Sequence, residues 1–130
     1  MNNYYTYIDN LSAEKISFDD MCQILSKLNN SIAMLHATDK MDFYNDFLAK
    51  GFKYAHIRSE WELLENTERA EKDSYRTSVH NSFITSINIL SRLCESEGID
   101  NSWRIKLTDD RKIIGDFACF VAYINGICNR

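Results

Sequence analysis

Residues 18–35 read FDDMCQILSKLNNSIAML, and this stretch decides the fold class. Its hydrophobic side chains recur at alternating intervals of three and four residues, which is the period of one face of an α-helix. The stripe consists of Phe18, Met21, Leu25, Leu28, Ile32 and Leu35. Ser17 directly before it is a favourable helix N-cap residue. We therefore predict a helix from Ser17 to about Ala37.

The same period continues in three further stretches, and the chain contains no proline to interrupt them. A second helical region follows Thr38 and Asp39, and Gly51 is expected to end it or bend it before residues 52–65 become helical again. A third helix is expected from Asn66 or Thr67 to Gly98. A last helix is expected from a cap at Thr108 to Gly126.

Residues 102–107 have a different pattern. Trp103, Ile105 and Leu107 alternate with Arg104 and Lys106, which is the period of a strand. The sequence thus predicts an all-α, compact bundle of four to five helices with a short extended segment near 102–107. We expect residues 1–130 to form a single helical domain, with residues 1–16 as an N-terminal arm or short helix.

Composition narrows the class of protein. The 130 residues are 45% hydrophobic and carry a net charge of −4, which disfavours direct generic binding to a phosphate backbone. The sequence has neither a long apolar run nor a basic leader, so we expect a cytoplasmic protein without membrane association. The four cysteines lack C-x-x-C spacing and are expected to be free thiols. The sequence leaves the oligomeric state open.

Motifs for catalysis, metals and cofactors are missing from the sequence. His36, His56 and His80 fall in three different predicted helices, and neither H-E-x-x-H nor E-x-x-H occurs. The sequence also lacks the glycine-rich phosphate loops and the nucleophile elbow of known enzyme classes. We therefore expect no metal, no cofactor and no enzymatic activity.

The polar face of the third predicted helix has two interpretations. It carries two arginines, a histidine and two asparagines among apolar neighbours, namely Arg76, His80, Asn81, Asn88 and Arg92. One interpretation is an anionic or polar ligand site, because arginine donates hydrogen bonds as a fork. The other is an internal polar network, with Arg92 paired to Asp116 or to a carboxylate in the last turn of the helix. A hydrolase that uses the same face is a third, weaker hypothesis.

An acidic run precedes that helix and is the candidate partner-binding surface. It contains Glu60, Glu62, Glu65, Glu68 and Glu71. Such a run is expected to meet a basic groove of a protein partner. The alternative is a solvated helix face with i,i+4 ion pairs, such as Glu68 with Lys72.

Three segments also resemble a known group of proteins: ERAEKDSYRTSVHN at residues 68–81, NILSR at 88–92 and DRKIIGDFA at 110–118. They resemble a small uncharacterised family, a domain of unknown function, from Gram-positive bacteria and their phages. The resemblance covers roughly residues 50–126 and implies a cytosolic or mobile-element protein without implying an activity. The first functional hypothesis is therefore a small non-catalytic interaction protein, phage or mobile-element encoded, that binds and blocks a host defence protein.

Overall fold

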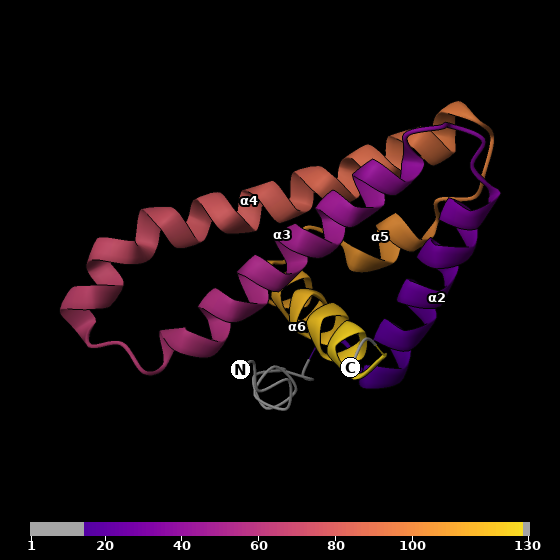
Figure 1. Cartoon of the computed structure of the whole chain (residues 1–130). Coiled ribbons are helices and arrows are strands. Elements are labelled where there is room, and N and C mark those ends of the chain that lie inside the picture. The colour runs from indigo at the N-terminus through magenta and orange to yellow at the C-terminus, as the bar shows by residue number, and fades with distance from the viewer. Residues whose placement is uncertain (1–14, 129–130) are drawn as a thin grey trace.

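The computed structural model describes residues 15–128, and they are mostly helical (Figure 1). The helices are α2 (Phe18–Met34), α3 (Lys40–Trp61), α4 (Asn66–Ser96), α5 (Trp103–Leu107) and α6 (Arg111–Cys128). No strand occurs in this range, so the prediction of an all-α bundle is confirmed. Of the predicted N-terminal arm, residues 1–14 lie outside the described part.

A long antiparallel hairpin of α3 and α4 dominates the arrangement. Helix α6 packs across α3, while α2 and the short α5 lie toward the end of the hairpin where α3 begins and α4 ends (Figure 1). At the opposite end, α3 and α4 project beyond the other helices. The fold therefore has a packed body and a projecting two-helix end.

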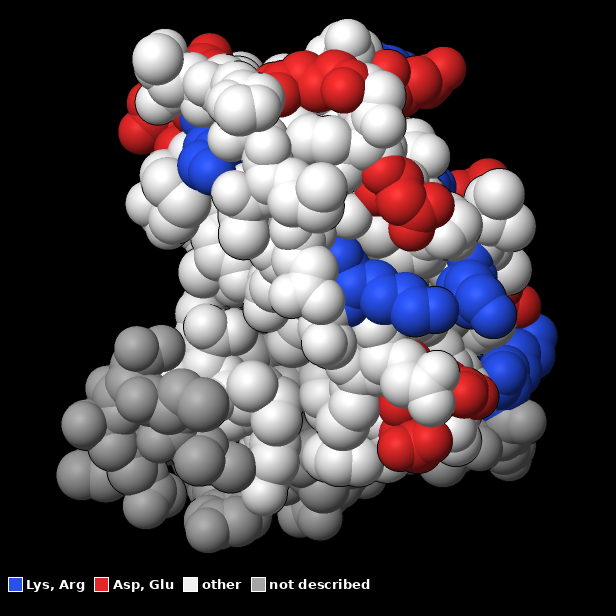
Figure 2. Space-filling model, turned by 90° about the vertical axis from the view of Figure 1, so that its right-hand side faces the viewer, with Lys and Arg blue, Asp and Glu red and all other residues white. Residues whose placement is uncertain are grey.

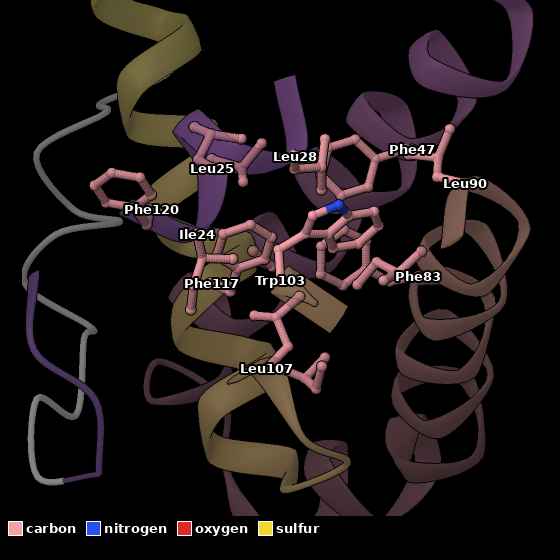
Figure 3. Close-up of a cluster of buried hydrophobic side chains, with 14 of the residues drawn as sticks. Ile24, Leu25, Leu28, Phe47, Phe83, Leu90, Trp103, Leu107, Phe117 and Phe120 are labelled. Carbon is pink, nitrogen blue, oxygen red and sulfur yellow. The ribbon is translucent and has the colours of Figure 1, made fainter. Parts of the chain in front are cut away.

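The core of the body is aromatic at its centre (Figure 3). Phe47 of α3 stacks on Phe83 of α4 with ring centroids 5.6 Å apart, and Phe117 of α6 lies 6.4 Å from Phe47. Trp103 of α5 is fully buried and lies among side chains of the neighbouring helices. Every residue from 114 to 122 is buried, which makes α6 the central helix of the bundle.

Two predicted helix ends are confirmed at atomic detail. The Ser17 hydroxyl accepts a hydrogen bond from the backbone nitrogen of Asp20 at 3.0 Å, as an N-cap residue does. Gly98 has a φ of 70°, and the nitrogen of Ile99 donates to the carbonyl of Cys94 at 2.8 Å. This is the hydrogen-bond pattern of a glycine-terminated helix, and it satisfies carbonyls that the end of α4 would otherwise leave open.

Gly51 neither ends nor interrupts α3, which is one continuous helix. Its role is to let α4 approach. A Cβ at this position would lie only 3.0 Å from the Phe83 ring. The missing side chain thus allows Phe83 to reach the centre of the core.

The prediction of an extended segment at 102–107 is wrong. These residues form α5, in which Trp103 and Leu107 are one helical turn apart and both buried, while Ile105 is 79% exposed. Over so few residues, an alternating pattern fits an i,i+4 helical pair as well as it fits a strand.

The start and the end of the last helix also differ from the prediction. Thr108 ends α5 with a positive φ of 55° and a ψ of −164°. Asp110 caps α6 instead: its Oδ1 accepts hydrogen bonds from the nitrogens of Lys112 and Ile113 at 2.9 and 3.2 Å. The helix then continues past Gly126 to Cys128. Within residues 15–128 no helix combines the length and the apolar character needed to cross a membrane.

Candidate functional site

The predicted ligand face on α4 is divided among three environments. Asn88 accepts a hydrogen bond from Arg104 of α5 at 2.7 Å, so it belongs to a contact inside the bundle. Asn81 is exposed beside a shallow polar hollow, and Arg92 is exposed on the outer side of α4. Arg76 and His80 face the junction of α4 with α3. The five residues therefore do not form one site.

The predicted pair of Arg92 with Asp116 is wrong, because Arg58 of α3 binds Asp116. The distance from Arg58 Nη1 to Asp116 Oδ1 is 2.9 Å. The Asp116 side chain is fully buried, and that of Arg58 is 16% exposed. Arg92 has no role in this contact, because the turn of α4 that carries it turns the side chain toward solvent.

Gly115 makes this ion pair possible. The Arg58 guanidinium lies so close to the Gly115 backbone that a Cβ there would be 2.7 Å from Nη1 and 2.8 Å from Cζ. Contacts this short do not occur between real atoms, so any side chain at position 115 must displace the guanidinium.

We expect Gly115→Ala to lower the free energy of unfolding by about 1–3 kcal/mol, the usual cost of overpacking a filled interior. In an Arg58→Ala background the same change should become neutral or stabilising by up to about 1 kcal/mol, since alanine favours helix more than glycine does. Urea denaturation of the single and double variants measures both effects. An equal loss in both backgrounds would show that the guanidinium is not the obstacle.

Arg76 and His80 are held by aromatic neighbours from α3. The Arg76 guanidinium lies 4.4 Å from the centre of the Trp61 ring, within cation–π distance. The His80 ring meets the Tyr54 ring edge to face at 5.3 Å. Burial lowers the pKa of both Arg76 and His80, and the positive charge of Arg111 lowers each further. His80 is therefore neutral near pH 7.

Both side chains also carry a buried nitrogen without a hydrogen-bond partner among the described residues. These atoms are Arg76 Nε and His80 Nε2. The other ring nitrogen of His80 lies 3.2 Å from Asn81 Oδ1. Buried polar atoms are nearly always paired, so unpaired ones need an explanation such as a ligand or an ordered water molecule.

Arg111, the first residue of α6, completes the group from the third helix. Its Nη2 lies 3.4 Å from Thr77 Oγ1, next to Arg76 in the α4 sequence, and its side chain is exposed. We call Arg58, Arg76, His80 and Arg111 the arginine junction. It gathers three guanidinium groups where α3, α4 and α6 meet, and one of them, that of Arg58, binds the buried carboxylate of Asp116.

Cys119 lies at this junction and is less acidic than an ordinary thiol. Burial raises the pKa of Cys119 to about 11, although Arg58 Nη1 lies 3.9 Å from its sulfur. Cys22 and Cys94 are likewise free thiols with raised pKa values. A thiol reacts as its thiolate, so the raised pKa leaves each of these three with a smaller thiolate fraction at neutral pH than an ordinary cysteine has. Cys128 falls outside the side chains that the structure describes.

The acidic run lies at the projecting end of the α3–α4 hairpin, which we call the hairpin end and define as residues 56–78. None of these residues is buried. Leu63 is 82% exposed and Tyr75 is 50% exposed. A groove of about 210 Å³ runs between the two helices, lined by Ile57, Glu60, Trp61, Leu64, Glu71, Lys72 and Tyr75.

The five predicted glutamates have different local roles. Glu65 and Glu68 form a capping box at the start of α4, with Glu68 Oε1 accepting from the Glu65 nitrogen at 3.2 Å. Glu60 lies 2.9 Å from His56 Nε2. Glu62 and Glu71 are exposed, and Glu71 lines the groove. These last two can therefore contact a partner without giving up a structural role.

Basic side chains gather on another face, the one that α2 occupies (Figure 2). Acidic side chains lie above and below them in this view. A groove of about 440 Å³ on this side of the bundle is lined by isoleucines and three lysines: Lys15, Ile16, Asp20, Gln23, Ile24, Lys27, Ile105, Lys106 and Ile113. Lys15 is held there by Asp110 at 2.7 Å. The groove has the apolar floor and cationic rim that suit an amphipathic anion.

Comparisons with family models, curated proteins and solved structures found no match. Nor do residues 15–128 bring together three or more histidine, cysteine or acidic side chains in a group that could hold a metal ion.

Sequence reasoning missed Arg58 and Arg111, although a signal for Arg58 exists. Phe47, Gly51, Tyr54, Arg58 and Trp61 follow one another at intervals of four, three, four and three, so Arg58 occupies a stripe position. Asp116 likewise interrupts the apolar run of α6. A charged residue at a core position on each of two helices predicts that they pair. Arg111 does not occupy such a core position in the sequence pattern, so no sequence signal marks it.

Proposed function

We propose that this chain is an interaction protein that binds a basic, partly apolar segment of a protein partner through the hairpin end. The observation that supports the proposal is the exposure of this two-helix extension, in which no residue from 56 to 78 is buried. A helical hairpin is normally stabilised by apolar burial, and this end has little of it.

The apolar residues of the hairpin end are arranged for contact with a partner. Trp61, Leu64 and Tyr75 line the groove, and Leu63 projects into solvent beside it. Tyr75 is 50% exposed, whereas Trp61 is partly buried and stacks under the Arg76 guanidinium. Aromatic side chains at a groove are typical centres of protein interfaces. A partner that covers these side chains would bury the apolar surface that the hairpin end leaves in contact with solvent.

Charge favours a basic partner. Residues 60–75 contain six carboxylates and two basic side chains, a net charge of −4 that equals the net charge of the whole chain. The remaining residues are therefore neutral in sum, and the negative field is concentrated at the hairpin end. Such a field accelerates encounter with a positive surface and sets the orientation of docking.

The identity of the partner as a host defence protein is a proposal that rests on the family resemblance alone. In that proposal the protein acts by occupying a basic groove of its target. The alternative, a small anionic or polar ligand site on the α4 face, requires a different set of residues from the one predicted, because Asn88 and Arg92 lie apart from Arg76 and His80.

The test uses charge reversal at positions without a structural role. We expect Glu62→Lys with Glu71→Lys to slow association with the partner about tenfold at low ionic strength and much less at high salt, because electrostatic steering is screened. The partner is first captured from a lysate of a Gram-positive bacterium, the host class that the resemblance implies. Association rates are then measured by surface plasmon resonance.

The matched control carries the same change in net charge away from the hairpin end. Asp42→Lys with Glu95→Lys replaces two exposed carboxylates on the same two helices. This control should associate nearly as fast as the wild type. Equal rates for all three proteins, or equal slowing in the control, would contradict binding through the hairpin end.

A further inference from the structure

The arginine junction is built by a repeated local geometry. Each of three helices supplies a pair of residues one turn apart, which therefore share a face. The pairs are Tyr54 and Arg58 on α3, Arg76 and His80 on α4, and Arg111 and Gly115 on α6. Contacts between them bring the three faces to one place: Tyr54 with His80, Arg58 with Gly115, and Arg111 with Thr77 beside Arg76.

The positive charges at this place exceed the negative ones. Asp116 forms an ion pair with Arg58. Within residues 15–128, neither Arg76 nor Arg111 has a carboxylate at salt-bridge distance; the charge of Asp73 raises the pKa of Arg76, but burial lowers it by more. The guanidinium groups of Arg76 and Arg111 thus have no ion-pair partner within residues 15–128, and the guanidinium of Arg58 is a third positive charge at this place.

Hydrogen-bonding capacity is also unused. His80 is only 8% exposed, and its Nε2 has no partner in the described chain. Arg76 Nε is also buried without a hydrogen-bond partner in the described chain. The stacking of Arg76 on Trp61 fixes the plane of its guanidinium, so its donors are oriented before any ligand arrives.

We propose that the arginine junction binds the phosphate group of a small phosphorylated compound. Arg76 and Arg111 bind the phosphate oxygens as paired donors, and Arg58 adds a fixed positive charge that Asp116 and Gly115 hold in place. His80 Nε2 accepts a hydrogen bond from a protonated phosphate oxygen, because the other ring nitrogen donates to Asn81 Oδ1. Guanidinium forks match phosphate oxygens in spacing and plane. This site goes beyond the proposed protein interaction, because it takes a different class of ligand and adds His80 and Arg111, which lie outside the hairpin end, to Arg58 and Arg76, which lie within it.

The first test is thermal denaturation with inorganic phosphate, with sodium chloride at equal ionic strength as the reference. We expect the wild-type melting temperature to rise by about 4 °C at a phosphate concentration ten times the Kd. Arg111→Gln should abolish the rise. Because Arg111 is exposed, this variant should fold normally. Arg92→Gln, an exposed arginine on α4, is the matched control and should keep the full rise.

Further titrations distinguish the sources of the phosphate group. Glycerol phosphate and a 5′-nucleoside monophosphate test whether an ester binds more tightly than inorganic phosphate, as the proposal expects. Citrate tests whether a carboxylate serves equally well, and an equal response to it would overturn the assignment to phosphate. So would a melting temperature that phosphate does not raise above the chloride reference, or a rise that Arg111→Gln and Arg92→Gln share.

The histidines supply a second, independent readout. The chain has three, and only His80 belongs to the junction. In ¹H–¹⁵N spectra of the imidazole rings, phosphate should shift the His80 resonances and leave those of His36 and His56 unchanged. Equal shifts of all three, or none for His80, would overturn the proposed place of binding.

Discussion

Arg58→Met is expected to lower the free energy of unfolding by about 3–5 kcal/mol, the usual cost of removing one partner from a buried ion pair. Asp116 is fully buried, so without the guanidinium its charge would be left without the opposite charge that now faces it. Methionine keeps most of the volume of the arginine stem, so the loss reflects the charge more than a cavity. Guanidinium chloride denaturation followed by circular dichroism measures it.

Asp116→Asn should cost less, because Arg58 keeps 16% of its side chain exposed and can turn toward water. The two losses should not add in the double variant, since each removes the same interaction. Arg92→Ala is the control: an exposed arginine outside any network should change stability by no more than about 0.5 kcal/mol. Additive losses for Arg58 and Asp116 would contradict the pairing.

Trp103→Ala is expected to cost about 3–5 kcal/mol, the typical range for removing a buried large aromatic side chain. Trp103 is fully buried, and it anchors a helix of only five residues to the bundle. So short a helix has no stability of its own. Its loss should therefore loosen the whole connection between α4 and α6.

Trp103→Phe separates packing from hydrogen bonding at this position. The indole Nε1 is buried without a partner in the described chain, so phenylalanine removes an unsatisfied donor while leaving a smaller cavity than alanine does. We expect a clearly smaller loss than for alanine. Ile105→Ala, at a neighbouring position that is 79% exposed, should be nearly neutral. Similar losses at both positions would argue against α5 as described.

Much of the helical architecture could be predicted because helix signals are local. The stripe that begins at Phe18, the N-cap Ser17 and the terminating Gly98 are each set by residues within one or two turns. Errors arose where a short pattern fits two structures. Helices that pack against these two places decide their structure: they bury Trp103 and Leu107 of the alternating segment, and they require a residue without a side chain at Gly51.

The candidate sites could be predicted only in part, and for the same reason. Arg76, His80 and the acidic run stand out in the sequence, and the structure places the first two together at one junction. Asn88 and Arg92 were grouped with them because they share a helix, yet a side chain on α4 meets a partner only where another helix passes. Arg58 replaced Arg92 as the partner of Asp116 for that reason.

The sequence by itself determined that this protein is helical, where most of its helices begin and end, and which end of the chain's longest hairpin is acidic. These properties depend on periodicity, capping and charge, which act between residues close in the chain. Only the tertiary structure decided that Arg58 pairs with Asp116, that Arg76 lies near both Arg58 and Arg111, and that residues 56–78 project unburied. Contacts between distant helices depend on how their surfaces pack, and a single helix's pattern does not record which neighbour will face it.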